Sequence, residues 1–396
     1  MAGASARHRA RRGRGDRGSP VVPCVGGAPG MMGVGVPSPS RSVPAAADVT
    51  AAAQLACLLE ASAPKPGNVS PGRHFADFRY EDLLASAAAI GGPLAGAATR
   101  PVGATVRLAV EATARWTRSN TNLGIVLLLA PLARAALLES ARTDSDPQSA
   151  VRNPRPDGSS NGLSRMGLRG ALGAVLESTT VHDARDVYAA IRRAAPGGLG
   201  RAEAQDVADE PTMTLLEVMR LAADRDGIAR EYATAFEATF GTGAPALDRA
   251  RRDGLSWDDA VVETFLTLLA AAPDTHVARR SGTTVAAEVS QQARAVLAEG
   301  GVRSAAGRRA IGEMDLRLRD ARNVANPGTT ADLTAAAIFV ELLGGGWSLF
   351  GSPERLALLA RGAPLPPLGA PLPPGARGVQ PSDPGRAVGG CDAATR

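Results

Sequence analysis

Hydrophobic residues recur with a helical period through most of residues 48–363. Leu55, Leu58 and Leu59 share one face of a predicted helix that Asp48 or Thr50 can cap and that ends near Ser62. Further helices are predicted at about 80–98, 103–119, 124–141, 165–178, 182–193, 212–223, 226–241, 244–252, 257–271, 284–299, 304–321 and 331–343. Alternating β-branched and aromatic runs are nearly absent. The pattern predicts a single all-α, multi-helical domain over residues 48–363.

Three segments lack this apolar period. Residues 1–47 are rich in Arg, Gly and Pro, and residues 364–396 are rich in Pro and Gly. Both are predicted to be disordered tails, because they cannot bury enough apolar surface to offset the entropy of ordering. Residues 142–164 are predicted to be a polar loop insertion.

The positive net charge of the chain comes from its two tails, not from its core. The formal charge is +5, but residues 1–47 hold seven Arg against one Asp and residues 364–396 hold three Arg against two Asp, so the core is slightly acidic. With only 3% aromatic residues, the core lacks the basic, aromatic-interleaved surface that binds nucleic acid. No nucleic-acid partner is therefore expected.

The sequence also argues against a membrane-spanning protein and against a metal site with cysteine ligands. The longest apolar run, Gly124 to Leu138, is interrupted by Pro131 and Arg134 and is too short to span a bilayer. The start of the chain lacks an apolar signal region, so we expect a soluble, cytoplasmic protein with no membrane partner. The cysteines have no metal-ligand spacing: Cys24, Cys57 and Cys391.

Lysine occurs once among the 44 Lys and Arg residues, at Lys65. A composition that replaces lysine by arginine wherever either serves predicts that this position needs an amine. Pro64 and Pro66 stiffen the segment, and Gly67 allows it to turn. The alternative is a lysine left by chance on a surface loop.

Polar residues with possible chemistry gather between the predicted helices. Glu60, Lys65, His74 and Asp77 lie within eighteen residues, which suits phosphate binding by Lys65 and metal binding or proton transfer by Asp77 or His74. A structural role for His74 is equally compatible with the sequence.

Two predicted helix starts could hold phosphate oxygens through their backbone N–H groups. The first carries Asn120, Asn122 and Gly124, and the second carries Gly328, Thr329 and Thr330. Ordinary helix capping is the alternative for each, and it also applies to Asn68 and to Asp332.

Two further segments carry residues that could bind phosphate or a metal ion. The glycine-rich stretch 196–203 is only a weak phosphate-loop signal, and the turn at 273–282 brings Asp274, Arg279 and Arg280 together. Because Mg²⁺ is bound through a few carboxylates and substrate phosphates, the acidic residues suit a nucleoside triphosphate substrate with Mg²⁺. Four of them are predicted metal ligands: Asp77, Glu203, Asp274 and Asp332.

The order of these motifs resembles the triphosphoribosyl-dephospho-CoA synthase family. The matching segments are Glu60–Val69, His74–Asp77, Thr121–Gly124, Gly200–Glu203, Asp274–Arg280 and Pro327–Leu333. The resemblance implies an all-helical fold and transfer of the triphosphoribosyl group of ATP to the 2′-hydroxyl of 3′-dephospho-CoA, with release of adenine. The product would be a prosthetic-group precursor of the acyl carrier subunits of citrate lyase and malonate decarboxylase.

The resemblance is closer to a divergent branch found in archaea and some bacteria. Only Leu123 stands between Asn122 and Gly124, where citrate-lyase-type enzymes carry His-Lys, and Phe75-Ala76 stands where they carry Lys-Asp. Dephospho-CoA or a related small molecule is therefore the expected acceptor.

Under this hypothesis, Lys65 with Arg279 or Arg280 neutralises the triphosphate of ATP, and Asn68 and the two helix starts add hydrogen bonds. Glu60 stabilises the ribosyl cation, and Asp77 or His74 deprotonates the acceptor. Two alternatives stay open: another Mg²⁺-dependent phosphotransferase or hydrolase, and a non-catalytic nucleotide-binding protein. The oligomeric state is also open, a homodimer being one option.

Overall fold

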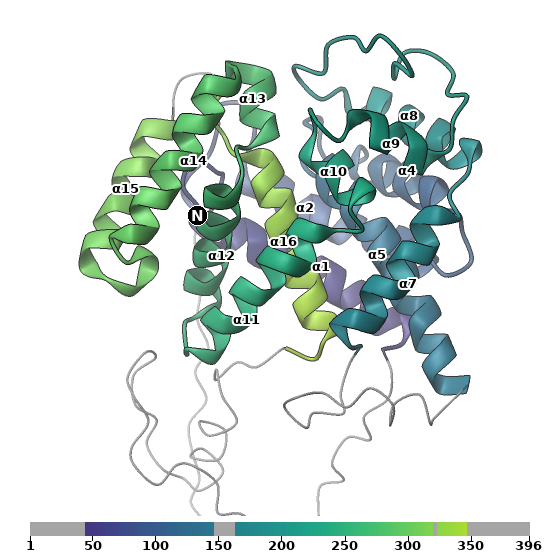
Figure 1. Cartoon of the computed structure of the whole chain (residues 1–396), viewed down its shortest axis with the longest axis horizontal. Helices are drawn as coiled ribbons and strands as arrows, with labels where there is room; N and C mark the ends of the chain where they lie inside the picture. Colours follow the sequence, from purple (N-terminus) through teal and green to yellow (C-terminus); the bar gives the residue numbers. More distant parts are fainter. Residues whose placement is uncertain (1–43, 146–162, 320–322, 347–396) are drawn as a thin grey trace, which may run out of the picture. The chain divides into compact units, whose positions relative to one another are not determined.

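The computed structural model describes residues 44–145, 163–319 and 323–346, which all belong to one compact unit. This part of the chain is helical, and its only β-pairing is a bridge between Ser70 and Arg73, which confirms the all-α prediction (Figure 1). In chain order the helices are α1 (Ala46–Ser62), α2 (Tyr80–Ala89), α3 (Gly91–Ala95), α4 (Val102–Thr113), α5 (Leu123–Ser145), α7 (Arg165–Glu177), α8 (Val181–Ala194), α9 (Leu215–Ala222), α10 (Gly227–Ala233), the π-helix η1 (Ala238–Gly243), α11 (Ala244–Arg252), α12 (Trp257–Ala271), α13 (Thr275–Ser281), α14 (Thr283–Ala298), the 3₁₀-helix η2 (Gly301–Arg303), α15 (Ala305–Leu318) and α16 (Gly328–Leu343).

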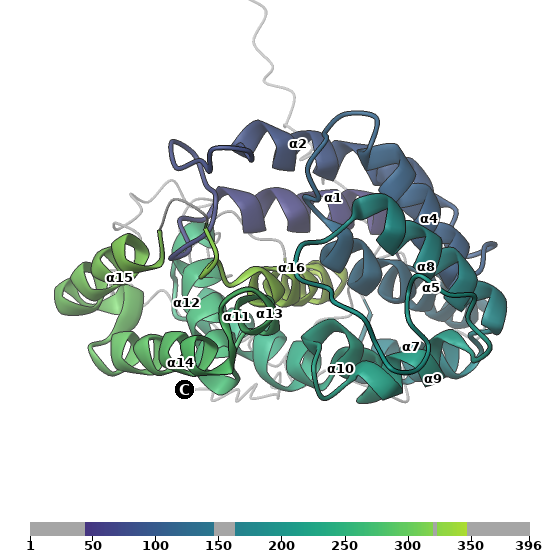
Figure 2. The same cartoon turned by 90° about the horizontal axis from the view of Figure 1, so that it is seen from above.

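Helix α16 lies at the centre of the described helices. It packs against α1, α5, α11 and α12, with α14 and α15 to one side and α4 and α8 to the other (Figures 1 and 2). Its middle, from Thr334 to Val340, is buried throughout. A helix that is apolar on all faces is expected in the interior, and here it places its first turn at the functional cavity described below.

Helix α5, with 23 residues, is the longest helix of the described part. Its segment Leu123–Thr143 is long and apolar enough to cross a membrane by length and composition, but 78% of its apolar window is buried among the other helices. Arg134, within this run, donates to the carbonyl oxygens of Ala97, Ala98 and Arg100 in the loop between α3 and α4. Core packing therefore accounts for the apolar composition of α5.

Some predicted helix boundaries differ from the structure. The stretch 80–98 is broken at Ile90 into α2 and α3, and 226–241 is interrupted after α10 by the positive φ angles of Ala235 and Phe236. Helix α13 was predicted as a turn, because seven residues are too few to show a helical period. Helix α16 begins three residues before the predicted start at 331, so Gly328–Thr330 form its first turn.

The predicted tails and insertion fall largely outside the described residues, in 1–43, 146–162 and 347–396. Where they adjoin described residues, α1 begins at Ala46, inside the predicted first tail, and α5 continues through Ser145. The far end of the predicted insertion is fixed by Leu163, whose N–H donates to the carbonyl oxygen of Leu343 at 3.0 Å.

Candidate active site

The segment that follows α1 forms a tight turn at the edge of the cavity. Pro66 and Gly67 occupy its central positions, Gly67 has φ +74°, and the N–H of Asn68 donates to the carbonyl oxygen of Lys65 at 3.2 Å. This is a type II turn, which favours proline followed by glycine. Asp315 of α15 holds it in place by accepting from the N–H of Gly67 at 2.8 Å.

Lys65 points inward from this turn and is only 1% exposed. Its ammonium group lies 3.0 Å from Oε1 of Glu60 and donates to the carbonyl oxygens of Glu60 and Ala63. These three contacts use all three of its hydrogens. Glu60 lines the cavity, whereas Lys65 does not and reaches it only through its ion pair with Glu60.

Asp274 connects the first turns of α13 and α16. One carboxylate oxygen accepts from the N–H groups of His276 and Val277, and the other accepts from the N–H and the hydroxyl of Thr330 at 2.7 Å each. Thr329 adds a contact between hydroxyl oxygens, 3.1 Å from Thr275. Both carboxylate oxygens of Asp274 are therefore used in helix capping. The N–H and the hydroxyl of Thr330 are in turn bound to Asp274.

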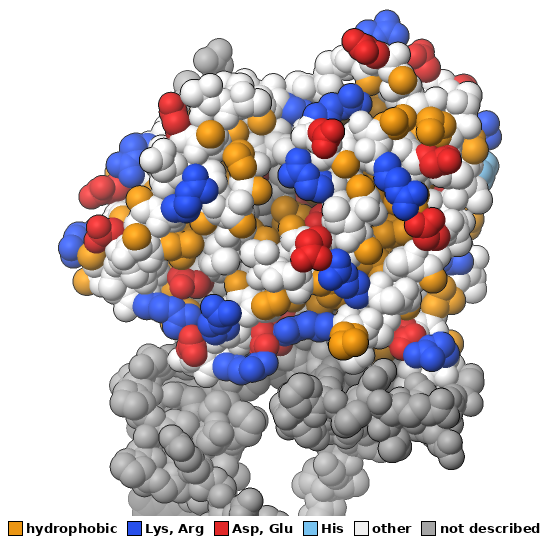
Figure 3. Space-filling model, viewed as in Figure 1, with side chains coloured by type: hydrophobic (Ala, Val, Ile, Leu, Met, Phe, Trp, Pro, Cys, Tyr) orange, Lys and Arg blue, Asp and Glu red, His pale blue; other side chains and the backbone are white. Residues whose placement is uncertain are grey.

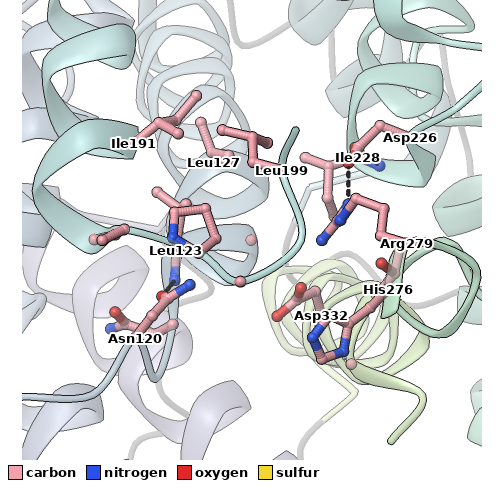
Figure 4. A pocket seen from close by; sticks show the side chains of 18 of the residues that line it. Asn120, Leu123, Leu127, Ile191, Leu199, Asp226, Ile228, His276, Arg279 and Asp332 are labelled. Atoms are coloured by element: carbon pink, nitrogen blue, oxygen red, sulfur yellow. Dashed lines mark hydrogen bonds and ion pairs between the residues drawn. The ribbon is translucent and has the colours of Figure 1, made fainter. Parts of the chain in front are cut away.

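His276 projects from α13 into the cavity (Figure 4). Its Nδ1 lies 3.1 Å from the carbonyl oxygen of Asn326, so Nδ1 carries the hydrogen and Nε2 is left as an acceptor. Burial lowers the pKa of His276, which favours this neutral form. A side chain on Gly328 would meet the imidazole, since a Cβ there would lie 2.6 Å from Nδ1.

Asp332 lies one turn into α16, facing the start of α5. A Cβ on Gly124 would come within 2.0 Å of its Oδ2, so glycine is required for this approach. Its carboxylate has no hydrogen-bond or ion-pair partner among the described residues. Burial, with further contributions from Glu60 and Asp274, raises the pKa of Asp332 well above its usual range. Burial therefore disfavours the charged form of Asp332, which a cation bound beside it would favour.

Arg279 and Asp226 form an ion pair across the cavity wall, with Nη1 2.5 Å from Oδ2. The other Asp226 oxygen accepts from the N–H groups of Ile228 and Ala229 at the start of α10. The Nε of Arg279 is buried without a partner in the described part of the chain. Arg280 also lines the cavity and donates to the carbonyl oxygen of Asn323 at 3.4 Å.

These residues surround a cavity of about 800 Å³ that is bounded by α1, α5, α8, α9, α10, α13 and α16. Figure 4 shows two sides of this cavity. One side, called the polar wall here, carries Asp226, His276, Arg279 and Asp332, with Ile228 beside them. The opposite side, called the apolar wall, carries Leu123, Leu127, Ile191 and Leu199, with Asn120 at its edge. Further lining residues are Glu60, Met219 and Leu221.

The glycine-rich stretch 196–203 crosses the cavity mouth between α8 and α13. Gly198 packs against the backbone of Arg279, and Leu199 lines the cavity. Glu203 is exposed and is not a lining residue. The acid that orders this loop is Asp206, whose carboxylate accepts from the N–H groups of Ala202 and Ala208.

Several predicted residues reach the cavity with their polar groups partly occupied. Asn120 accepts from the N–H of Leu123 as a helix cap, buried Asn122 donates to Thr113, and buried Asn68 donates to the carbonyl oxygen of Pro66. Asp77 is exposed at the cavity rim. His74 lies outside it and accepts from the N–H of Tyr80 at 3.3 Å.

The four predicted metal ligands do not converge in the structure. Within residues 44–145, 163–319 and 323–346, no three His, Cys, Asp or Glu side chains form a metal-binding group. Asp274 is occupied, Glu203 faces solvent, and Asp77 lies on the rim. Only Asp332 offers a partner-free carboxylate inside the cavity, which fits a cation that arrives with most of its ligands on substrate phosphates.

The lining residues that sequence reasoning missed include His276, Asp226, Arg118 and Arg225. His276 lies within the segment 273–282, which stood out in the sequence because of Asp274 and the two arginines and not because of the histidine. Arg118 and Arg225 have no side-chain hydrogen bond or ion pair in the described part of the chain. No sequence signal distinguishes them, because arginine is also the ordinary surface cation here, interspersed with carboxylates on the face shown in Figure 3.

The fold and the cavity together define an all-helical protein with a nucleotide-sized site of mixed charge. Residues 46–350 match the family described as ATP:dephospho-CoA triphosphoribosyl transferase, and the chain belongs to this family of transferases.

Individual relatives agree with this assignment. A protein of Pseudomonas putida named "Probable 2-(5''-triphosphoribosyl)-3'-dephosphocoenzyme-A synthase" is 44% identical over 119 residues, which is 30% of this chain and 42% of that protein. A protein of the same name from Pseudomonas paraeruginosa is 41% identical over 126 residues, 31% of this chain and 42% of its own length. The matched stretch thus spans about two fifths of these relatives.

A crystal structure described as a triphosphoribosyl-dephospho-CoA synthase from Archaeoglobus fulgidus is 26% identical. It aligns with a TM-score of 0.48 over 66% of this chain and 99% of that one.

Proposed function

We propose that the protein transfers the triphosphoribosyl group of ATP to the 2′-hydroxyl of 3′-dephospho-CoA and releases adenine. The observation that supports this proposal most directly is that residues of separate sequence motifs meet in one cavity. Glu60, Gly124, Arg279 and Asp332 come from four motif segments far apart in the chain, and all line one cavity. Family membership supplies the reaction type, and the geometry supplies residues for each of its steps.

The donor side requires stabilisation of two opposite charges. As the C1′–N9 bond of ATP breaks, its electrons move to adenine and positive charge develops at C1′. Glu60, fixed by its ion pair with Lys65, provides a negative charge for that cation. The uncommitted guanidinium groups of Arg118 and Arg225 and the partner-free Nε of Arg279 suit the triphosphate.

Mg²⁺ is proposed to enter with ATP, with Asp332 as its carboxylate ligand. Bound there, the ion would neutralise phosphate charge. It would also compensate the Asp332 carboxylate, whose pKa is raised in its absence.

The acceptor side requires removal of one proton. The 2′-oxygen of dephospho-CoA forms the new bond to C1′ and loses its hydrogen, while adenine leaves and takes up a proton. His276 presents Nε2 as an acceptor in the cavity, with its other ring nitrogen fixed on Asn326. We assign it the role of base in preference to His74, which lies outside the cavity.

Product analysis tests the proposal. Incubation of the purified protein with ATP, Mg²⁺ and dephospho-CoA should yield free adenine and an acceptor heavier by one triphosphoribosyl group, as detected by mass spectrometry. His276→Gln and Asp332→Asn should each slow the reaction at least about 100-fold. Formation of ADP or AMP without adenine would replace the proposal with a phosphotransferase or hydrolase reaction. A cytoplasmic location and the oligomeric state stay predictions.

A further inference from the structure

We infer that the apolar wall of the cavity binds the pantetheine arm of the acceptor, and that Leu199 and Leu221 determine the preference for an acceptor carrying this arm. The inference rests on the proposed function, which it deepens by assigning the two substrates to different walls.

Exposed leucine side chains mark the apolar wall as a surface that a ligand covers. Six large hydrophobic side chains of the described residues are exposed, and two of them line this cavity: Leu199 at 45% and Leu221 at 52%. Leu199 lies beside Leu127 and Ile191 on the apolar wall (Figure 4), and Leu221 adds a second exposed leucine to the lining of the cavity. Apolar area left open to water at a concave site is typical of a binding surface.

Charge distribution decides which substrate part lies here. The leucine and isoleucine side chains of the apolar wall carry no charge, whereas the carboxylates of Asp226 and Asp332 and the guanidinium group of Arg279 lie opposite them (Figure 4). A triphosphate requires cations and hydrogen-bond donors, which the cavity offers at its arginines and not at these apolar side chains. The pantetheine arm is an uncharged chain of alkyl and amide groups, and it is the longest uncharged part of either substrate. It therefore matches the apolar wall.

Leu199 has a particular place in this arrangement because it lies on the glycine-rich loop at the cavity mouth. The loop is anchored on its far side, where Tyr188 donates to the carbonyl oxygen of Gln205 at 2.5 Å and Asp206 caps two N–H groups. Gly198 and Gly200 flank Leu199 with positive φ angles. The leucine is thus presented from a loop that is hydrogen-bonded at residues 202–208, and it adds apolar surface to the wall.

The test compares ligand binding by the purified full chain with that of the double variant Leu199→Gln/Leu221→Gln. Calorimetry would measure the affinities for dephospho-CoA, for ADP, which lacks the arm, and for ATP. We expect the double variant to weaken dephospho-CoA binding about tenfold through lost apolar burial, and to change ADP and ATP binding less than about twofold. Leu316→Gln on α15 is the matched control, because Leu316 is 74% exposed and does not line the cavity.

Two results would overturn the inference: unchanged affinity of the double variant for dephospho-CoA, or an equal loss for ADP or ATP. Failure of the proposed function is distinguishable from both. If the wild-type protein releases no adenine but the double variant loses affinity for dephospho-CoA alone, the assignment of the wall is supported and the proposed reaction is contradicted. If adenine is released and the double variant binds dephospho-CoA as tightly as the wild type, the proposed reaction is supported and the assignment of the wall is contradicted.

Discussion

Lys65 and Glu60 form a buried ion pair in which each side chain fixes the other. The sequence singled out Lys65 by its uniqueness, and it predicted a phosphate-facing amine. The structure turns the amine toward Glu60 and two carbonyl oxygens instead. The orientation could not be predicted, because it depends on how the type II turn folds back onto the last turn of α1.

Lys65→Met should destabilise the protein by about 3–5 kcal/mol, because it leaves the Glu60 carboxylate buried without its counter-charge. The double variant Lys65→Met/Glu60→Gln should recover much of that loss in urea unfolding, since the partners act as a unit. Arg317→Met on the exposed pair with Glu313 is the control, with an expected change below about 0.5 kcal/mol. Strictly additive effects of the two substitutions would contradict a coupled pair.

Burial disfavours the charged form of the Asp332 carboxyl group by raising its pKa. Asp332→Asn should therefore raise the free energy of unfolding at pH 7 by about 1 kcal/mol while turnover is lost, as at other sites where function costs stability. The pKa of Asp332 is raised in the folded state, so its contribution to stability is present below the ordinary aspartate pKa of about 3.9 and is lost as the pH rises. The advantage of the Asn variant should thus vanish near pH 3 and grow toward neutral pH. A gain that does not depend on pH would contradict this explanation.

At the scale of elements, the corner between α13 and α16 forms part of the polar wall. The start of α16 was predicted to hold phosphate, but Asp274 accepts from the N–H and the hydroxyl of Thr330 there, and its other oxygen caps α13. The sequence could show that Thr330 lies at a helix start and that Asp274 lies in a turn between helices. It could not show that the two starts meet, because 56 residues separate them and the contact depends on the packing of α13 against α16.

Asp274→Ala should cost about 3 kcal/mol in urea unfolding, because it removes one helix cap and leaves buried donors on α13 and α16 unpaired. Ser304→Ala, which removes a single cap from α15, should cost only about 1 kcal/mol. Asp274→Asn should leave the Mg²⁺ concentration for half-maximal turnover unchanged. A large increase in that concentration would identify Asp274 as a metal ligand instead.

At the scale of the whole molecule, one cavity collects residues from α1 to α16 around a central apolar helix. The all-helical fold could be predicted because a period of 3.6 residues persists along the core, and four motif segments could be predicted because their residue types are unusual between helices. The apolar wall could not be predicted in the same way. Leu127 and Ile191 have the pattern of any core-facing residue, and only the packing shows that they face a cavity.

The central claim is the coupling of adenine release to acceptor modification. The most direct measurement is the stoichiometry of the two products when the purified chain is incubated with ATP labelled in its adenine ring, Mg²⁺ and dephospho-CoA. The account predicts one free adenine for each dephospho-CoA that gains a triphosphoribosyl group. Label that stays in ADP, AMP or unchanged ATP, or adenine released without a modified acceptor, would contradict it.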